Sequence, residues 1–453
     1  MVSAPASAGQ EDLRGFLVRV EAAGKLRRVA AAELTAIPGL MREAEKAGMT
    51  LLVERVEGCQ AAGDGEAAGA CLAGHASNLL VTREHLVTAF STGGVVGRGA
   101  IAPEFTRRTA RLIPPVVMEH GPVQEVVKLG EEADVRAFPL LKHSPKDVDR
   151  YVTAGVVIAR DPETGIRNAS INRMQLKGPR KLGIRMMAPQ HLGRIYEKAE
   201  RLGRPLEVAV AVGVHPLDLL AASTSVAFGL DELGLAGSLR GEPLQLVRCR
   251  TVDLEVPAGA EVVIEGEVPP REREAEGPFG DFMQYYVPVM DNHVLHVRAI
   301  THRRHPLFGA IKAGSVEDTH LLACSREAAI YQAARETGTE VTAVNLGPTI
   351  LNCAIAIRKR DEDEPRRVLE KAFGCYPWLK YCVVVDHDVD VFDLADVWWA
   401  MATRSAPGPG TLRLDAPGFP RDPYRLHQSK LGIDATAPLG RWEEFERTRG
   451  RQE

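Results

Sequence analysis

Short runs of β-branched residues, separated by turn signals, dominate the middle third of this 453-residue chain. They are found at residues 152–159, 207–214, 246–256, 261–267 and 293–300. Such runs predict a β-rich domain, because short strands joined by regular turns pair into sheets. The length suggests about three domains, at roughly 150 residues each.

The segments on either side of this β-rich region mix helices with strands. Near the N-terminus, apolar residues at helical spacing over 11–29 predict a helix, and residues 51–53 form a short apolar run that predicts a strand. The Gly/Ala-rich stretch 61–70 has the composition of a loop. Towards the C-terminus we expect helices at 325–336, 365–373 and 394–403 and strands within 343–357 and 381–386.

Changes of pattern near residues 115 and 318 divide the chain into three predicted domains. They are an N-terminal α/β domain (1–115), a β-rich domain (116–317) and a C-terminal α/β domain (318–453). The Pro/Gly-rich tail from residue 405 either wraps a neighbouring subunit or lies along the surface. The predicted fold class is therefore mixed α/β.

Composition excludes several classes of function. The chain has 56 basic and 60 acidic side chains, so no overall field attracts nucleic acid or an anionic membrane. Neither a secretory signal nor an apolar run long enough to span a bilayer is apparent, which predicts a cytoplasmic protein. The seven cysteines form no Cys-x-x-Cys pair, and this favours a reducing compartment.

Residues 167–175 are an unusually polar predicted strand. The alternation of a strand places Asn168, Ser170 and Asn172 on one side and Arg173 on the other. A solvated edge strand would have the same composition. If Arg173 is buried, however, it requires a carboxylate partner.

Glu276 and Asp281 are candidate partners, since they flank the loop Gly-Pro-Phe-Gly. The glycines permit sharp turns that can direct both acids to one point. Paired acids near an arginine are suited to proton transfer, although the same residues are also common in ordinary loops.

Taken together, the motifs resemble those of the UbiD decarboxylases in order and spacing. The resemblance covers residues from about 115 to about 440. It rests on residues 168–175, 189–191, 231–233 with 236–243, 276–281 and 430–436.

The resemblance implies a split β-barrel that holds prenylated FMN, followed by a dimerisation domain. It places a divalent ion, Mn²⁺ or Mg²⁺, on Asn168, His191 and Glu232, against the cofactor phosphate. Oxygen donors with one imidazole suit such an ion. Taken alone, His191 would instead be a packing or helix-start histidine. The residues implied to contact the cofactor, its ions or an accompanying K⁺ are Thr153, Asn168, Ser170, Ile171, Asn172, Arg173, Gln190, His191, Ser223, Glu232 and Lys380.

The catalytic trio implied by the resemblance is Arg173, Glu276 and Asp281. Arg173 would pair with Glu276 and orient the substrate carboxylate, while Asp281 would donate the proton. The implied reaction is a reversible, non-oxidative decarboxylation of an α,β-unsaturated or (hetero)aromatic acid through a covalent adduct with prenylated FMN. The segment 312–320 is expected to form a loop over the pocket, in which His320 contacts a polar substrate, caps a helix or lies at the surface.

The implied partners are a small carboxylic acid, a flavin prenyltransferase that supplies the cofactor, and a second copy of the chain. Two other functions are compatible with the fold. One is an FMN-dependent oxidoreductase or flavin reductase, in which the paired acids would have no evident task. The other is a non-catalytic subunit that retains the fold.

Overall fold

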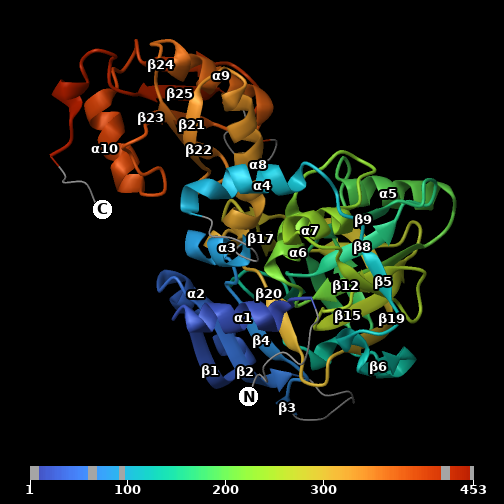
Figure 1. Cartoon of the computed structure of the whole chain (residues 1–453). Coiled ribbons are helices and arrows are strands. Elements are labelled where there is room, and N and C mark those ends of the chain that lie inside the picture. The colour runs from blue at the N-terminus through green and yellow to red at the C-terminus, as the bar shows by residue number, and fades with distance from the viewer. Residues whose placement is uncertain (1–9, 60–68, 91–96, 420–428, 449–453) are drawn as a thin grey trace. The chain divides into compact units, whose positions relative to one another are not determined.

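The structure is a computed structural model that describes residues 10–59, 69–90, 97–419 and 429–448 (Figure 1). The chain divides into two compact units. The first contains residues 1–95 and 108–321, and the second contains residues 96–107 and 322–453. The three predicted domain boundaries stay a prediction. Most of the predicted loop 61–70 lies outside the described residues, as does part of the tail.

The N-terminal part of the first unit is a small sheet with helices. The strand order is β1 (Leu26–Glu33), β2 (Thr50–Cys59), β4 (Gly74–Ser77) and β20 (Leu307–Ala310), with β3 (Gly69–Ala70) also paired to β2. The helices are α1 (Leu13–Ala22), α2 (Ile37–Lys46) and α3 (Arg83–Phe90). The strand predicted at 51–53 is confirmed as part of β2. The helix predicted over 11–29 is confirmed only for α1, because residues 26–29 belong to β1. Figure 1 shows β20, which comes from much later in the chain, beside β4.

Cys59 and Cys71 form a disulfide within this part, with Cα atoms 5.0 Å apart. This bond was not predicted, because the cysteine pattern favoured a reducing compartment, in which thiols stay free. The two cysteines are twelve residues apart in sequence, and only the pairing of β2 with β3 brings them together.

A ten-stranded antiparallel sheet forms the centre of the first unit. Its main path is β7 (Tyr151–Val152), β10 (Met174–Gly178), β11 (Lys181–Ile184), β19 (Met290–His302), β15 (Val262–Val268), β12 (Leu206–Val212), β8 (Val156–Arg160) and β9 (Arg167–Ile171). Strands β6 (Val126–Leu129) and β16 (Arg273–Glu276) pair with β19. The predicted β-rich centre is therefore confirmed.

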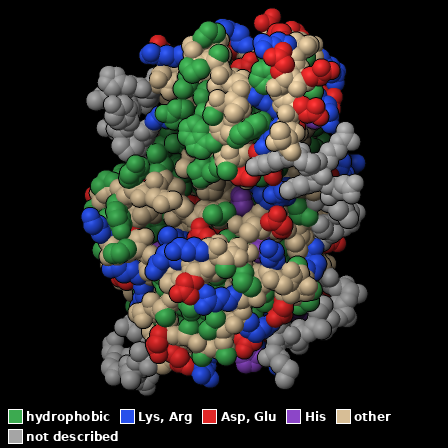
Figure 2. Space-filling view, turned by 90° about the vertical axis from the view of Figure 1, so that its left-hand side faces the viewer, with side chains coloured by type: hydrophobic (Ala, Val, Ile, Leu, Met, Phe, Trp, Pro, Cys, Tyr) green, Lys and Arg blue, Asp and Glu red, His purple; other side chains and the backbone are tan. Residues whose placement is uncertain are grey.

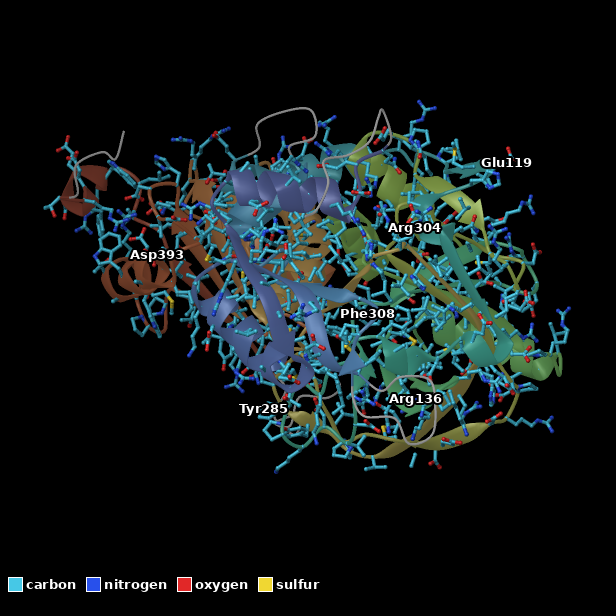
Figure 3. All side chains as sticks on the ribbon, turned by 90° about the horizontal axis from the view of Figure 1, so that it is seen from below. Glu119, Arg136, Tyr285, Arg304, Phe308 and Asp393 are labelled. Carbon is cyan, nitrogen blue, oxygen red and sulfur yellow. A yellow bond between two sulfur atoms is a disulfide. The ribbon has the colours of Figure 1, made fainter. Side chains whose placement is uncertain are left out.

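Apolar side chains from these strands form the main core. Val157, Val210 and Ile264 are fully buried in it, and Phe308 is 1% exposed. Figure 3 shows Phe308 in the interior, whereas Glu119 and Tyr285 lie at the periphery of the unit. Burial of such side chains is the main source of stability in a sheet of this kind.

Three helices and two smaller sheets complete the first unit. The helices are α5 (His191–Arg201), α6 (Pro216–Ser223) and α7 (Glu232–Arg240). One small sheet contains β5 (Val116–Met118), β13 (Gln245–Arg248) and β14 (Glu255–Pro257), and the other pairs β17 (Phe279–Gly280) with β18 (Tyr286–Val287). The predicted run 246–256 is thus two strands joined by a turn.

The polar segment 167–175 is not one strand, as predicted, but two. Strand β9 ends at Ile171, and β10 begins at Met174. Asn172 and Arg173 lie between them, so simple alternation does not decide where these two side chains point. The amide of Asn172 donates to the carbonyl of Arg185, which holds the connection in place.

The second unit is a five-stranded sheet with helices. The strand order is β21 (Glu340–Asn345), β22 (Asn352–Arg358), β23 (Tyr381–Asp386), β25 (Lys430–Ala435) and β24 (Thr411–Leu414). The helices α9 (Glu364–Cys375) and α10 (Leu394–Arg404) belong to it, while α4 (Ile101–Thr109) and α8 (Val316–Arg335) cross the division between the units. The predicted helices and strands here are confirmed, except that α8 begins nine residues earlier than residue 325.

Within the described residues, no helix combines the length and apolar character needed to cross a bilayer. Basic and acidic side chains are interspersed over the face drawn in Figure 2. This mixture agrees with the small net charge of −4.

Candidate active site

Glu232 is the first residue of α7 and lies in a buried polar corner of the first unit. Its carboxylate accepts hydrogen bonds from the amide of Asn168 (2.9 Å) and from the backbone N–H of Ala169 (2.9 Å). His191 Nδ1, at the start of α5, lies 3.5 Å from Glu232 Oε1. The structure therefore brings together the three predicted metal ligands, which come from β9, α5 and α7.

The electrostatics of this corner favour a bound cation. Burial raises the pKa of Glu232 to about 7, and its hydrogen bonds only partly oppose this effect. Burial also lowers the pKa of His191, with a contribution from the charge of Arg194, so the imidazole is neutral and can act as a ligand. Among the described residues, Glu232 pairs with no lysine or arginine.

An unsatisfied acceptor gives a second reason to expect a cation here. Asn168 Oδ1 is buried and has no hydrogen-bond partner among the residues that the structure describes. A cavity of about 10 Å³, lined in part by Asn168, His191 and Phe228, lies beside it. The two oxygen donors and one imidazole thus fit a hard or borderline cation. No cluster of three or more His, Cys, Asp and Glu side chains suited to a metal occurs in the described part of the chain. This corner is not such a cluster, because its third donor is the amide of Asn168.

Arg173 and Glu276 form the second polar cluster of the first unit. The guanidinium donates from Nε to Oε1 (3.0 Å) and from Nη2 to Oε2 (2.8 Å). Glu276 is fully buried, and the Arg173 side chain is 12% exposed. This confirms that the two residues meet, as the sequence predicted. A bidentate pair of this kind is strong and fixes the plane of the guanidinium.

The chain around Glu276 leads directly to Asp281. Gly277 has a backbone φ of +97°, which residues other than glycine rarely adopt. The turn after Glu276 therefore requires glycine. The ring of Phe279 then lies 4.7 Å from the guanidinium carbon of Arg173. Asp281 follows two residues later, and its Oδ1 accepts a hydrogen bond from Met283 N at 2.9 Å.

Buried groups around Asp281 hold its loop. The carboxylate of Asp147 accepts from Gly280 N (3.0 Å) and Ser144 N (2.8 Å). Asp318, at the start of α8, accepts from Gly314 N (2.8 Å). Burial and the charge of Asp281 raise the pKa of Asp318 to about 6. The bond from Gly280 N to Asp147 therefore fixes the backbone just before Asp281. After Asp281, Gln284 Nε2 donates to the carbonyl of Gly314 at 3.2 Å and ties the other end of the loop.

The remaining predicted contacts lie in several places. Thr153 Oγ1 is 3.2 Å from His143 Nε2 and accepts from Ile311 N. Ser170 donates to Asn172 Oδ1, and Ser223 donates to the carbonyls of Leu220 and Leu321. Ile171 ends β9, and Gln190 is the N-cap residue of α5.

Lys380 belongs to the second unit. It directly precedes β23, and its backbone bonds to Leu351 and Leu431. The structure therefore leaves the predicted cofactor contact of Lys380 as a prediction.

His320 is not in a loop. The segment 312–320 is a short turn followed by the first residues of α8, and His320 Nδ1 lies 2.7 Å from the carbonyl oxygen of Leu80. The expectation of a loop along the whole segment is therefore wrong. The observed contact of His320 is structural.

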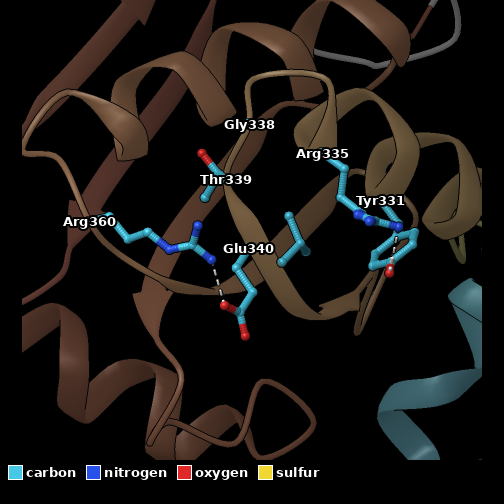
Figure 4. Close-up of a pocket in the computed structure, with 7 residues that line it drawn as sticks. Tyr331, Arg335, Gly338, Thr339, Glu340 and Arg360 are labelled. Atoms are coloured by element: carbon cyan, nitrogen blue, oxygen red, sulfur yellow. Dashed lines mark hydrogen bonds and ion pairs between the residues drawn. The ribbon is translucent and has the colours of Figure 1, made fainter.

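A larger hollow of about 420 Å³ lies in the second unit (Figure 4). Its lining includes Tyr331, Arg335, Glu340 and Arg360. Arg360 pairs with Glu340 at 2.8 Å. None of the predicted site residues lines this hollow.

Two residues near the predicted trio were missed by the sequence analysis. Asn292 donates to Glu276 Oε2 at 2.8 Å, and the ring of Tyr151 packs on Phe279 with centroids 4.5 Å apart. Their positions depend on which strands pair, so no local motif identified them.

Comparison with known proteins identifies the family. Residues 115–316 match the family model described as the UbiD 3-octaprenyl-4-hydroxybenzoate carboxy-lyase Rift-related domain. Residues 319–435 match the model of the corresponding C-terminal domain. The chain belongs to the UbiD family.

Relatives of this UbiD protein include decarboxylases. It is 39% identical to the anhydromevalonate phosphate decarboxylase of Methanothermobacter thermautotrophicus over 70% of this chain and 76% of the relative. The UbiD-class enzyme HmfF of Pelotomaculum thermopropionicum, solved with FMN, is 38% identical with a TM-score of 0.89, over 97% of this chain and 98% of HmfF. An evolved dimeric form of HmfF, solved with prFMN, is 37% identical with a TM-score of 0.86, over 98% and 97% of the two chains. The protein is therefore a carboxy-lyase of the UbiD class.

Proposed function

We propose that the protein decarboxylates an α,β-unsaturated or (hetero)aromatic carboxylic acid with prenylated FMN as cofactor. The observation that carries this proposal is the ion pair between Arg173, two residues after β9, and the buried Glu276 at the end of β16. Phe279, whose ring contacts the guanidinium, and Asp281 follow Glu276 in the chain. Loss of carbon dioxide from an sp² carbon needs an electron sink, which prenylated FMN supplies when bound. The side chains then have to bind the acid and deliver a proton.

Arg173 is suited to binding the substrate carboxylate. Glu276 uses only Nε and Nη2 of the guanidinium, and Nη1 has no hydrogen bond within the described part of the chain. A guanidinium can therefore keep its buried partner and still offer one charged donor to a second carboxylate. Glu276 is fully buried, so its carboxylate is shielded from water, whereas the Arg173 side chain is 12% exposed.

Asp281 is proposed as the acid that protonates the substrate carbon. Its loop is held by the bond from Gly280 N to Asp147 and by the bond from Gln284 Nε2 to the carbonyl of Gly314. An acid needs such a fixed position to reach one carbon reproducibly. An aspartate has one methylene fewer than a glutamate, so the backbone of the loop must come close to the reacting carbon.

The corner formed by Asn168, His191 and Glu232 is proposed to hold Mn²⁺ or Mg²⁺ against the cofactor phosphate. The unsatisfied Asn168 oxygen and the raised pKa of Glu232 support this assignment. Thr153, Ser170, Ile171, Asn172, Gln190, Ser223 and Lys380 remain proposed contacts of the cofactor or of an accompanying K⁺.

The proposed partners are a flavin prenyltransferase and a second copy of the chain. They are supported by the prFMN in the dimeric form of HmfF. The relatives also extend the range of acids worth testing, because the Methanothermobacter protein is a decarboxylase of anhydromevalonate phosphate.

Co-expression with a flavin prenyltransferase tests the proposal. The purified protein should carry a flavin with the mass of prenylated FMN. It should release carbon dioxide from at least one member of a panel that contains cinnamate, furoate, hydroxybenzoate and anhydromevalonate phosphate. Wild-type protein that carries the cofactor and turns over none of these acids would contradict the substrate class. Oxidation of NADPH with FMN would favour a reductase instead.

The metal site has a separate test. Glu232→Ala should lose flavin during purification, because the cation that neutralises the phosphate would no longer be held. Asp231→Asn is the matched control, since Asp231 caps α7 and pairs with Arg167, and asparagine keeps an oxygen that can cap the helix. Full flavin occupancy in Glu232→Ala would remove the metal assignment.

A further inference from the structure

Asn292 contacts the fully buried Glu276 from a neighbouring strand. It lies on β19, opposite Glu274 of β16, while Met290 lies opposite Glu276 itself. The Asn292 side chain is buried, at 4% exposure, and its Nδ2 donates to Glu276 Oε2 at 2.8 Å. Because β16 and β19 belong to one antiparallel pair, this donor is held by the sheet and not by a loop.

The hydrogen bonds to Glu276 show what the amide of Asn292 contributes. Oε1 accepts from Arg173 Nε, and Oε2 accepts from both Arg173 Nη2 and Asn292 Nδ2. Arg173 is on the short connection between β9 and β10, so the sheet does not fix its guanidinium directly. The carboxylate plane therefore sets the guanidinium plane, and the amide from β19 sets the carboxylate plane.

We propose that Asn292 is a positioning residue of the decarboxylase: it orients Glu276 so that Arg173 presents its remaining donor, Nη1, to the substrate carboxylate. The inference rests on the proposed substrate-binding function of Arg173. Asn292 does not touch the substrate in this scheme and acts only through the ion pair.

Tyr151 is a second group beside Glu276 that could replace the missing donor. Its hydroxyl is buried and interacts with the Glu276 carboxylate, although it makes no well-formed hydrogen bond within the described residues. Burial and the negative charge of Glu276 raise the pKa of Tyr151, so the hydroxyl keeps its proton. The Tyr151 hydroxyl could therefore donate to Glu276 when the Asn292 amide is removed. A double variant with Tyr151→Phe excludes this replacement.

Two substitutions of Asn292 distinguish positioning from a structural role. Asn292→Leu removes the donor and should lower kcat/KM about 10- to 100-fold, because a buried charged acceptor loses one partner. Asn292→Asp places a second carboxylate beside Glu276, and the two acids would share one proton. When protonated, the introduced aspartic acid can donate the same hydrogen bond as the amide.

The pH profile is therefore the decisive measurement. The ratio of kcat/KM in Asn292→Asp to that of wild type should rise at least about tenfold as the pH falls from 8 to 5, whereas the ratio for Asn292→Leu should stay constant. The other groups that face Glu276 are Arg173, which stays charged, and Tyr151, which stays protonated. The double variant with Tyr151→Phe should fall below Asn292→Leu.

The experiment uses the flavin-loaded protein and the acid of the panel above that wild type turns over fastest. Asn345→Asp is the control, because Asn345 is also buried and donates at 2.8 Å, but to the carbonyl of Val391 in the second unit. Its ratio to wild type should not depend on pH.

Wild-type kcat/KM in Asn292→Leu and in its double variant with Tyr151→Phe would overturn the inference. So would an Asn292→Asp ratio that is flat with pH. If wild type turns over no acid, the proposed function fails first. The contact can then be tested without substrate, by measuring the free energy of unfolding of both variants at pH 5 and pH 8. Asn292→Asp should lose stability relative to Asn292→Leu as the pH rises. A difference between the two variants that is the same at both pH values would overturn the contact. If Asn292→Leu does not fold, Asn292→Ser and Asn292→Asp at pH 5 provide the same comparison.

Discussion

Glu232 is a buried carboxylate without a cationic side-chain partner among the described residues, and its replacement by glutamine should change how stability depends on pH. Burial raises its pKa from 4.5 to about 7 in the folded protein. The folded protein therefore holds this proton more tightly than the unfolded chain does. Metal-free wild type should lose stability as the pH rises from 4.5 through about 7, whereas Glu232→Gln has no proton to lose.

The size of the effect follows from the two pKa values. One pKa unit corresponds to about 1.36 kcal/mol. The raised pKa of Glu232 therefore lowers the free energy of unfolding by roughly 1 kcal/mol at pH 5 and by roughly 3 kcal/mol at pH 8. We therefore expect Glu232→Gln to gain about 2–3 kcal/mol relative to wild type between these two pH values. Solvent screens the Glu232 carboxylate little, because its side chain is only 3% exposed.

Chemical denaturation of metal-free, flavin-free protein at pH 5 and pH 8 measures this difference. Comparing the two pH values cancels any hydrogen bond that glutamine fails to make, since that loss does not depend on pH. Glu317, whose pKa burial raises to about 8, titrates in both proteins and cancels as well. Added MnCl₂ should stabilise wild type at pH 8 but not the variant. An equal stability difference at both pH values would refute the reasoning.

Three further predictions concern the trio and the disulfide. Asp281→Asn should keep its flavin but lose about 10²- to 10⁴-fold in turnover and in solvent deuterium exchange into product, measured by NMR, and normal exchange would count against the proton-donor role. Arg173→Ala should lose about 3–5 kcal/mol of stability in denaturant titrations, because Glu276 remains as an unpaired buried charge; a loss below about 1 kcal/mol would contradict the observed burial. Cys71→Ser should lower stability by about 2–4 kcal/mol through loss of the bond to Cys59, and an unchanged melting temperature under non-reducing conditions would argue that the bond is absent in solution.

Local patterns in the sequence located some of the helices and strands. The apolar spacing near residue 13 corresponds to the buried face of α1, and the β-branched run at 381–386 corresponds to β23, which is buried along nearly its whole length. Helices α2 to α7 were not predicted. The beginning of α8 was missed. Its first turn contains Glu317, a carboxylate that accepts from the backbone of residues 78–80, and such a contact leaves no periodic signal.

The pairing of Arg173 with Glu276 was predictable in kind but not in geometry. A buried arginine requires a carboxylate, and the resemblance of the motifs indicated which one. The break between β9 and β10 was not predictable from alternation, because Asn172 bonds to the carbonyl of Arg185 instead of continuing the strand.

The sequence by itself determined the residue types of this protein's site, their order, and the family whose motifs they match. Only the tertiary structure decided that Asn292 reaches Glu276 and that the Asn168 oxygen finds no hydrogen-bond partner within the described part of the chain. The physical reason is that strand register and burial are set by packing between distant segments. Residues that meet across paired strands carry no mark of that meeting in their own neighbourhood of the chain.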